Sequence, residues 1–203
     1  FMSLPSGIAF SDNGNFATST SVLDANHGQS GPAGRFTGPT LWSSDPLIYA
    51  QYAGPGTNGS HLDMLHASPY CMGIASESAN IFWVYDDYSN DIVRYDFAQD
   101  HGPGNDDHDD GMIRRFPDMG LSSINDGNTV SDGNNSVNLE FVNHLVLDAD
   151  KKWLYFVDSG NLRILRLDIT TGTTNGTPSF PQQEQLAEYK KMIGFVWEEV
   201  VTT

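Results

Sequence analysis

Short apolar runs of strand-like composition occur in pairs along the chain, and one pair is repeated about seventy residues later. The two pairs are 81–86 with 91–96, and 153–158 with 163–168. Both strands follow the same offset of 72 residues, so that Asp86 corresponds to Asp158 and Asp96 to Asp168. The turn between the strands therefore keeps its length, and a fixed period of this kind is typical of repeat architectures.

A further apolar run precedes each hairpin and predicts a third strand in each unit. These runs begin at Gly73 and His144. A similar pattern opens the chain, where 5–10 is followed by a turn and by 15–18. We therefore expect one domain, 1–203, made of three units that begin near Gly7, Gly73 and His144. The predicted units span approximately 1–60, 61–138 and 139–203.

The runs 81–85 and 153–157 are apolar without interruption and rich in β-branched and aromatic residues. A strand with one face in water would alternate between apolar and polar residues, so we expect both faces of these strands to be covered. Runs this short, bounded by polar residues and glycine, do not fit buried helices. The pattern favours β-propeller blades, in which neighbouring blades supply the cover. A flattened, open solenoid of three units is the alternative.

Two stretches of the sequence resemble a known family. Pro-Ser-Gly-Ile-Ala-Phe opens at Pro5 and leads into Asp-Asn-Gly-Asn-Phe, and Trp-Leu-Tyr-Phe-Val-Asp-Ser-Gly-Asn-Leu-Arg-Ile-Leu-Arg-Leu-Asp opens at Trp153. Both are similar to the NHL-type repeat of six-bladed β-propellers. The resemblance implies an all-β chain of three four-stranded blades, half of a six-bladed propeller. It implies no single activity, because that repeat serves in binding modules, lyases and hydrolases.

Three blades do not close a ring, since propellers contain about four to eight. Both ends of the chain look cut, which predicts a partial or processed polypeptide, or a unit that closes by self-association. Unpartnered blades would expose broad apolar faces with aromatic residues such as Trp83 and Tyr155. We therefore expect a second chain or copy to complete the propeller, through Phe10 and Phe16 on the first blade and the segment after Leu186 on the third.

Acidic residues dominate the charge of the chain. Lys and Arg number 10 against 26 Asp and Glu, for a net charge of −16, although only 18% of residues are charged. Nucleic acid and anionic membranes are poor partners for such a surface, whereas cations fit it. No apolar run approaches the roughly 20 residues needed to span a bilayer. The single cysteine, Cys71, excludes an internal disulfide framework and is expected to be a buried, small hydrophobic residue.

Three glycosylation sequons lie in segments rich in Gly, Asn and Thr, and they begin at Asn58, Asn134 and Asn175. Low lysine content, abundant small polar residues and a removed leader would together be typical of a secreted protein. We therefore predict an extracellular glycoprotein.

The segment 100–111 carries the densest set of candidate ligands, with five Asp and two His in twelve residues. The candidate metal ligands in it are Asp100, His101, Asp106, Asp107, His108, Asp109 and Asp110. Clustered carboxylates suit Ca²⁺, and the imidazoles would instead suit Zn²⁺ or another transition metal. The segment is not an EF-hand, because Pro117 stands where the closing Glu would be. A solvated acidic loop is the alternative.

Histidines form the second constellation. His61 and His66 precede the first strand of the second unit, and His144 opens the third. If these residues lined a central channel, they could hold a catalytic zinc, as histidines do in propellers such as the peptidylglycine amidating lyases. The pattern departs from that arrangement, because Gly7 and Gly73 occupy the positions that match His144. Structural or hydrogen-bonding histidines are the alternative.

These features favour a secreted, acidic binding or scaffold module with cation-binding loops. The alternative is a metal-dependent lyase or hydrolase with its site at the central channel. The two differ in whether His61, His66 and His144 converge on one point.

Overall fold

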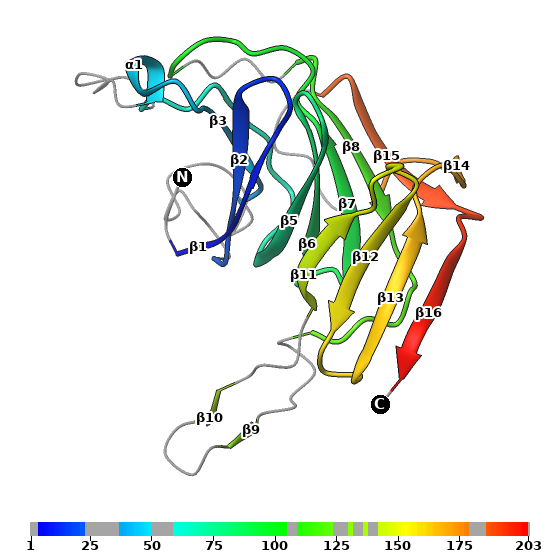
Figure 1. The fold of residues 1–203 in the computed structure, drawn as a ribbon. Helices are drawn as coiled ribbons and strands as arrows, with labels where there is room; N and C mark the ends of the chain where they lie inside the picture. The colour runs from blue at the N-terminus through cyan, green and yellow to red at the C-terminus, as the bar shows by residue number, and fades with distance from the viewer. Residues whose placement is uncertain are drawn as a thin grey trace.

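The computed structural model describes residues 4–22, 37–49, 59–104, 109–123, 130–131, 136–137, 142–178 and 186–202. The fold is all-β, with three sheets of four to six strands that fan out side by side (Figure 1). A separate two-stranded ribbon is formed by β9 (Val130–Ser131) and β10 (Ser136–Val137). The all-β prediction is confirmed, and in the described part of the chain the three sheets do not close into a barrel.

The first sheet has the order β1-β2-β3-β4, and all its neighbouring strands are antiparallel. Its strands are β1 (Pro5–Phe10), β2 (Asn15–Thr20), β3 (Thr40–Ser43) and β4 (Asp63–Met64). One helical turn, α1 (Pro46–Tyr49), follows β3. The fourth strand comes from just beyond residue 60, where the first unit was expected to end.

The second sheet is built on the meander β5 (Cys71–Ser78), β6 (Ile81–Asp86), β7 (Asp91–Asp96) and β8 (Met112–Phe116). The third has the order β11 (Val142–Leu147), β12 (Trp153–Asp158), β13 (Arg163–Asp168) and β16 (Trp197–Thr202). Between β13 and β16 the chain crosses to the second sheet. There β15 (Glu188–Ile193) pairs in parallel with β8, and β14 (Thr173–Thr174) pairs with β15.

The repeated hairpins have the predicted bounds, because β6, β7, β12 and β13 coincide with the four apolar runs. An aspartate at the end of the second strand organises each turn. The Asp86 carboxylate accepts hydrogen bonds from the amides of Tyr88 at 3.0 Å and Ser89 at 3.2 Å. The Asp158 carboxylate accepts from the Arg163 guanidinium at 2.8 Å across its own turn. These short-range contacts explain why the turns keep one length.

Two hydrophobic cores lie between successive sheets. In β6, Phe82 and Val84 face the core shared with the first sheet, whereas Trp83 and Tyr85 face the core shared with the third. All four side chains are buried, which confirms that the 81–85 run is covered on both faces. The second sheet is therefore the middle layer of the molecule.

The first strands of the three sheets lie next to one another, β1 beside β5 and β5 beside β11. Each has an irregularity at the same place, between Pro5 and Gly7, between Met72 and Ile74, and between Val142 and Leu145. A Cβ atom on Gly73, where φ is +61°, would lie 2.5 Å from Leu145 Cδ1. Glycine at this position therefore permits the close approach of adjacent first strands.

One prediction for the third sheet is wrong. The 153–157 run was predicted to be covered on both faces, but β12 alternates between buried and half-buried residues. Leu154 and Phe156 pack against the second sheet, whereas the opposite face carries no further sheet among the described residues. Ile164 is accordingly 36% exposed, although its equivalent Ile92 is fully buried.

Candidate functional site

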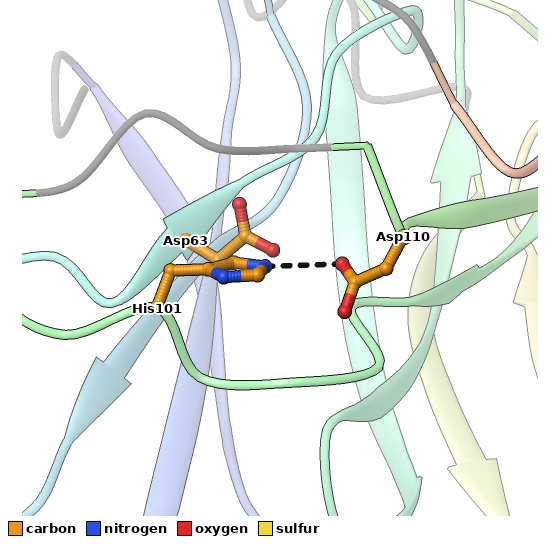
Figure 2. A group of neighbouring side chains, drawn as sticks. All are labelled: Asp63, His101 and Asp110. Atoms are coloured by element: carbon orange, nitrogen blue, oxygen red, sulfur yellow. Dashed lines mark hydrogen bonds and ion pairs between the residues drawn. The ribbon is translucent and has the colours of Figure 1, made fainter.

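One group of side chains in the described residues could hold a metal ion, and it consists of Asp63, His101 and Asp110 (Figure 2). Each offers one ligand atom, and these atoms all lie within 4.8 Å of one another. The His101 Nε2 atom is 3.0 Å from Asp110 Oδ1. A carboxylate from β4 thus meets an imidazole and a second carboxylate from the loop between β7 and β8.

The first and second sheets bring this group together. Asp63 lies in β4 and pairs with Leu41 of β3, and its side chain is fully buried. His101 lies in the loop after β7, which is tied to the β4 segment because the Gly104 amide donates to the His61 carbonyl at 2.8 Å. Asp110 lies just before β8 and accepts from the Gln99 amide at 3.2 Å. Backbone contacts therefore hold the loop against β4.

The ligand types define what this group can bind. Aspartate oxygens bind many divalent cations, and an imidazole nitrogen favours Zn²⁺ and other transition metals over Ca²⁺. Asp63 is fully buried, while the His101 and Asp110 side chains are 17% and 35% exposed. An ion could therefore reach the group from the loop side and would there bind a carboxylate that is shielded from water.

The predicted acidic loop contributes two of these three residues, His101 and Asp110. The carboxylate of Asp100 instead accepts from the Gly102 amide at 2.7 Å, and Asp109 is exposed. Asp106, Asp107 and His108 lie outside the described residues.

Sequence reasoning missed Asp63. Its position between Leu62 and Met64, both apolar, was the available signal, because a carboxylate in an apolar run indicates a buried acid that needs a polar or cationic neighbour. The neighbour itself could not be predicted, since 38 residues separate Asp63 from His101.

The three histidines of the predicted channel site do not form a metal-binding group in the described residues. His61 and His66 are buried, and the His61 ring packs edge-on against Trp42, with ring centroids 6.1 Å apart. His144 is exposed on β11 of the third sheet. The sequons fall in different settings, because Asn175 is exposed directly after β14 while Asn58 and Asn134 lie outside the described residues.

A second polar cluster is centred on Arg115 of β8 and contacts the segment 61–68. The Arg115 Nη1 atom donates to Asp86 at 2.7 Å and to Asp91 at 3.0 Å, and Nε donates to the Tyr189 hydroxyl at 3.1 Å. Its Nη2 atom donates to the Ala67 carbonyl. The guanidinium therefore fixes the segment that presents Asp63.

Burial raises the pKa of the acidic groups around Arg115. It raises the pKa of the Asp91 carboxyl to about 6, although Arg115 acts in the opposite direction. Burial likewise raises the pKa of Asp86 and, strongly, that of the Cys71 thiol. Cys71 is fully buried, as predicted, and is poorly suited to act as a nucleophile.

We expect Asp91 to make the chain more stable in mild acid. Because its folded pKa lies above the ordinary value, its contribution to stability is present below about pH 4 and is lost as the pH rises through about 6. The free energy of unfolding of the native chain minus that of Asp91→Asn should therefore rise by about 2 to 3 kcal/mol between pH 7 and pH 4. Denaturant unfolding at each pH measures this difference.

Asp158→Asn provides a control of opposite sign. Burial raises the Asp158 pKa, but hydrogen bonds from Ser122, Asn161 and Arg163 outweigh burial and lower it. The free energy of unfolding of the native chain minus that of Asp158→Asn should fall as the pH drops below about 4. If both differences moved in the same direction, the assignment of the Asp91 shift to burial would be wrong.

No protein-family model matches this chain, and no curated protein matches it. Within the described residues, none of the helices is long and apolar enough to cross a membrane.

Proposed function

We propose that the chain is a binding or scaffold module of the β-propeller type that holds a divalent cation at Asp63, His101 and Asp110. The observation that carries the proposal is the convergence of these three ligand atoms within 4.8 Å. The ion would join the loop after β7 to the last strand of the first sheet. It would thereby stabilise the contact between the two sheets, which is a structural role suited to a scaffold module.

The propeller part of the proposal is supported by the arrangement of the sheets. Each begins with an antiparallel meander, the first strands are adjacent, and the repeat offset keeps equivalent residues on equivalent faces. Propeller blades have these properties. The NHL-type resemblance and an extracellular location remain predictions.

Titration of the metal-free chain with Zn²⁺, Mn²⁺ and Ca²⁺ by calorimetry tests the cation site. We expect one ion per chain and tighter binding of the transition metals than of Ca²⁺, because His101 supplies nitrogen. Asp63→Asn and His101→Ala should each weaken binding at least about tenfold. Binding should also weaken as the pH falls to about 5.5, since the imidazole must lose its proton to act as a ligand.

Asp100→Asn is the matched control, because Asp100 lies in the same loop with its carboxylate directed at the Gly102 amide. This variant should bind metal as the native chain does. Equal weakening by Asp100→Asn and Asp63→Asn would mean that the loop attracts cations only through its overall charge, and the assigned site would be rejected.

A further inference from the structure

Among the described residues, no sheet covers one apolar face of the first sheet or one apolar face of the third, and these are called the open faces. The open face of the first sheet carries Ile8 and Phe10, which are 56% and 66% exposed, beside Phe16, which is buried against Tyr49 of α1. A hollow of about 670 Å³ lies on it, between these residues and Tyr49. The open face of the third sheet carries Val146, Tyr155, Val157, Ile164 and Val201.

Both open faces have buried counterparts inside the same chain. On the first sheet, Ile8 pairs with Thr18 as Ile74 pairs with Val84 on the second, so Ile8 is the equivalent of Ile74. Ile74 and Val84 are buried against the first sheet. The open face of the first sheet therefore corresponds to the face of the second sheet that packs against the sheet before it in the chain.

The third sheet supplies the complementary face. Ile164 pairs with Val157 as Ile92 pairs with Tyr85 on the second sheet. Ile92 and Tyr85 are buried against the third sheet. The open face of the third sheet therefore corresponds to the face of the second sheet that packs against the sheet after it in the chain.

We propose that two copies of this chain associate head to tail, with the open face of the third sheet of one copy on the open face of the first sheet of the other. The contact would repeat the packing that the chain already uses twice between its own sheets. Two such contacts related by a two-fold axis would bring six sheets into one ring, a number within the range of known propellers. The proposal goes beyond cation binding and does not require it.

His144 makes the new contact differ from the two internal ones. Gly7 and Gly73 stand at the equivalent bulge positions, where a Cβ would lie 3.1 Å from Ile74 Cγ2 and 2.5 Å from Leu145 Cδ1. The matching neighbour of His144 would be Ile8 of the second copy. Because His144 carries a full side chain, β11 and the second β1 must lie further apart than the internal first strands do.

Light scattering on the 203-residue chain over a range of concentrations, with chelator present, tests the association. We expect a particle of twice the 22.3 kDa chain mass. Ile164→Lys and Phe10→Lys should each give monomers, since either change places a charge in both contacts of the ring. Repulsion between acidic chains cannot explain this loss, because each lysine lowers the net negative charge.

Mixing the two variants separates head-to-tail packing from other arrangements. One contact between an Ile164→Lys chain and a Phe10→Lys chain contains no substituted face, so the mixture should regain dimers. Ile193→Lys is the control, because Ile193 is 41% exposed but lies on β15 of the second sheet, and this variant should stay dimeric. A folded native chain that remains monomeric, or a dimer lost with only one of the two face variants, would overturn the proposal.

Discussion

Arg115→Met is expected to lower the free energy of unfolding by about 3 to 5 kcal/mol. The Arg115 side chain is 3% exposed and pairs with Asp86, which is fully buried, and with Asp91, which is 11% exposed. Removing the cation leaves two buried carboxylates without its charge, and it also removes the donors to Ala67 and Tyr189. Urea unfolding at neutral pH measures the loss.

Arg166→Met is the matched control for this change. Arg166 and its partner Glu198 are 31% and 47% exposed, so water screens their ion pair and its loss should destabilise the chain far less than the loss of Arg115. Combining Arg115→Met with Asp86→Asn and Asp91→Asn should recover part of the stability, because the uncompensated charges are removed together. A loss for Arg115→Met no larger than that for Arg166→Met would show that the cluster is not electrostatically important.

Ile92→Ala and Ile164→Ala should differ strongly, although the two residues occupy the same place in the repeat. Ile92 is fully buried between two sheets, so its truncation should lower the free energy of unfolding by about 2 to 5 kcal/mol. Ile164 is 36% exposed on the open face, and its truncation should have an effect below about 1 kcal/mol when the chain is dilute. Equal losses at low concentration would mean that the open face of the third sheet is covered within the single chain.

Dimer formation should change the effect of Ile164→Ala on stability but not the effect of Ile92→Ala. At concentrations where the native chain forms dimers, Ile164→Ala should weaken the dimer, whereas Ile92→Ala should not act on the contact directly. Repeating both unfolding curves at a high concentration therefore links this pair of variants to the proposed assembly.

The hairpins could be predicted from the sequence because their contacts are local. The apolar runs set the strands, and Asp86 and Asp158 form short-range hydrogen bonds that set the turns. All-β architecture therefore needed no knowledge of distant pairings.

The elements that could not be predicted depend on pairings between distant segments. β15 adds to the edge of the second sheet beside β8, more than seventy residues earlier, and its polar sequence Glu-Tyr-Lys-Lys carries no mark of that partner. Asp63 meets His101 only because β4 joins β3. The different burial of Ile92 and Ile164 likewise depends on which sheet is last in the stack. The repeat places the same residue type at both positions and so does not indicate which of the two is covered.

The crossing of the chain between β13 and β16 has a consequence for how the molecule can come apart. Repeat proteins often lose their units one by one from an end, because each unit contacts only its neighbours. Here the segment that completes the third sheet first forms two strands on the second sheet, and Phe195 packs against Phe116 on the way back, with ring centroids 5.2 Å apart. We therefore expect the second and third sheets to open together, because detaching β16 would pull on the segment that forms β14 and β15 at the edge of the second sheet.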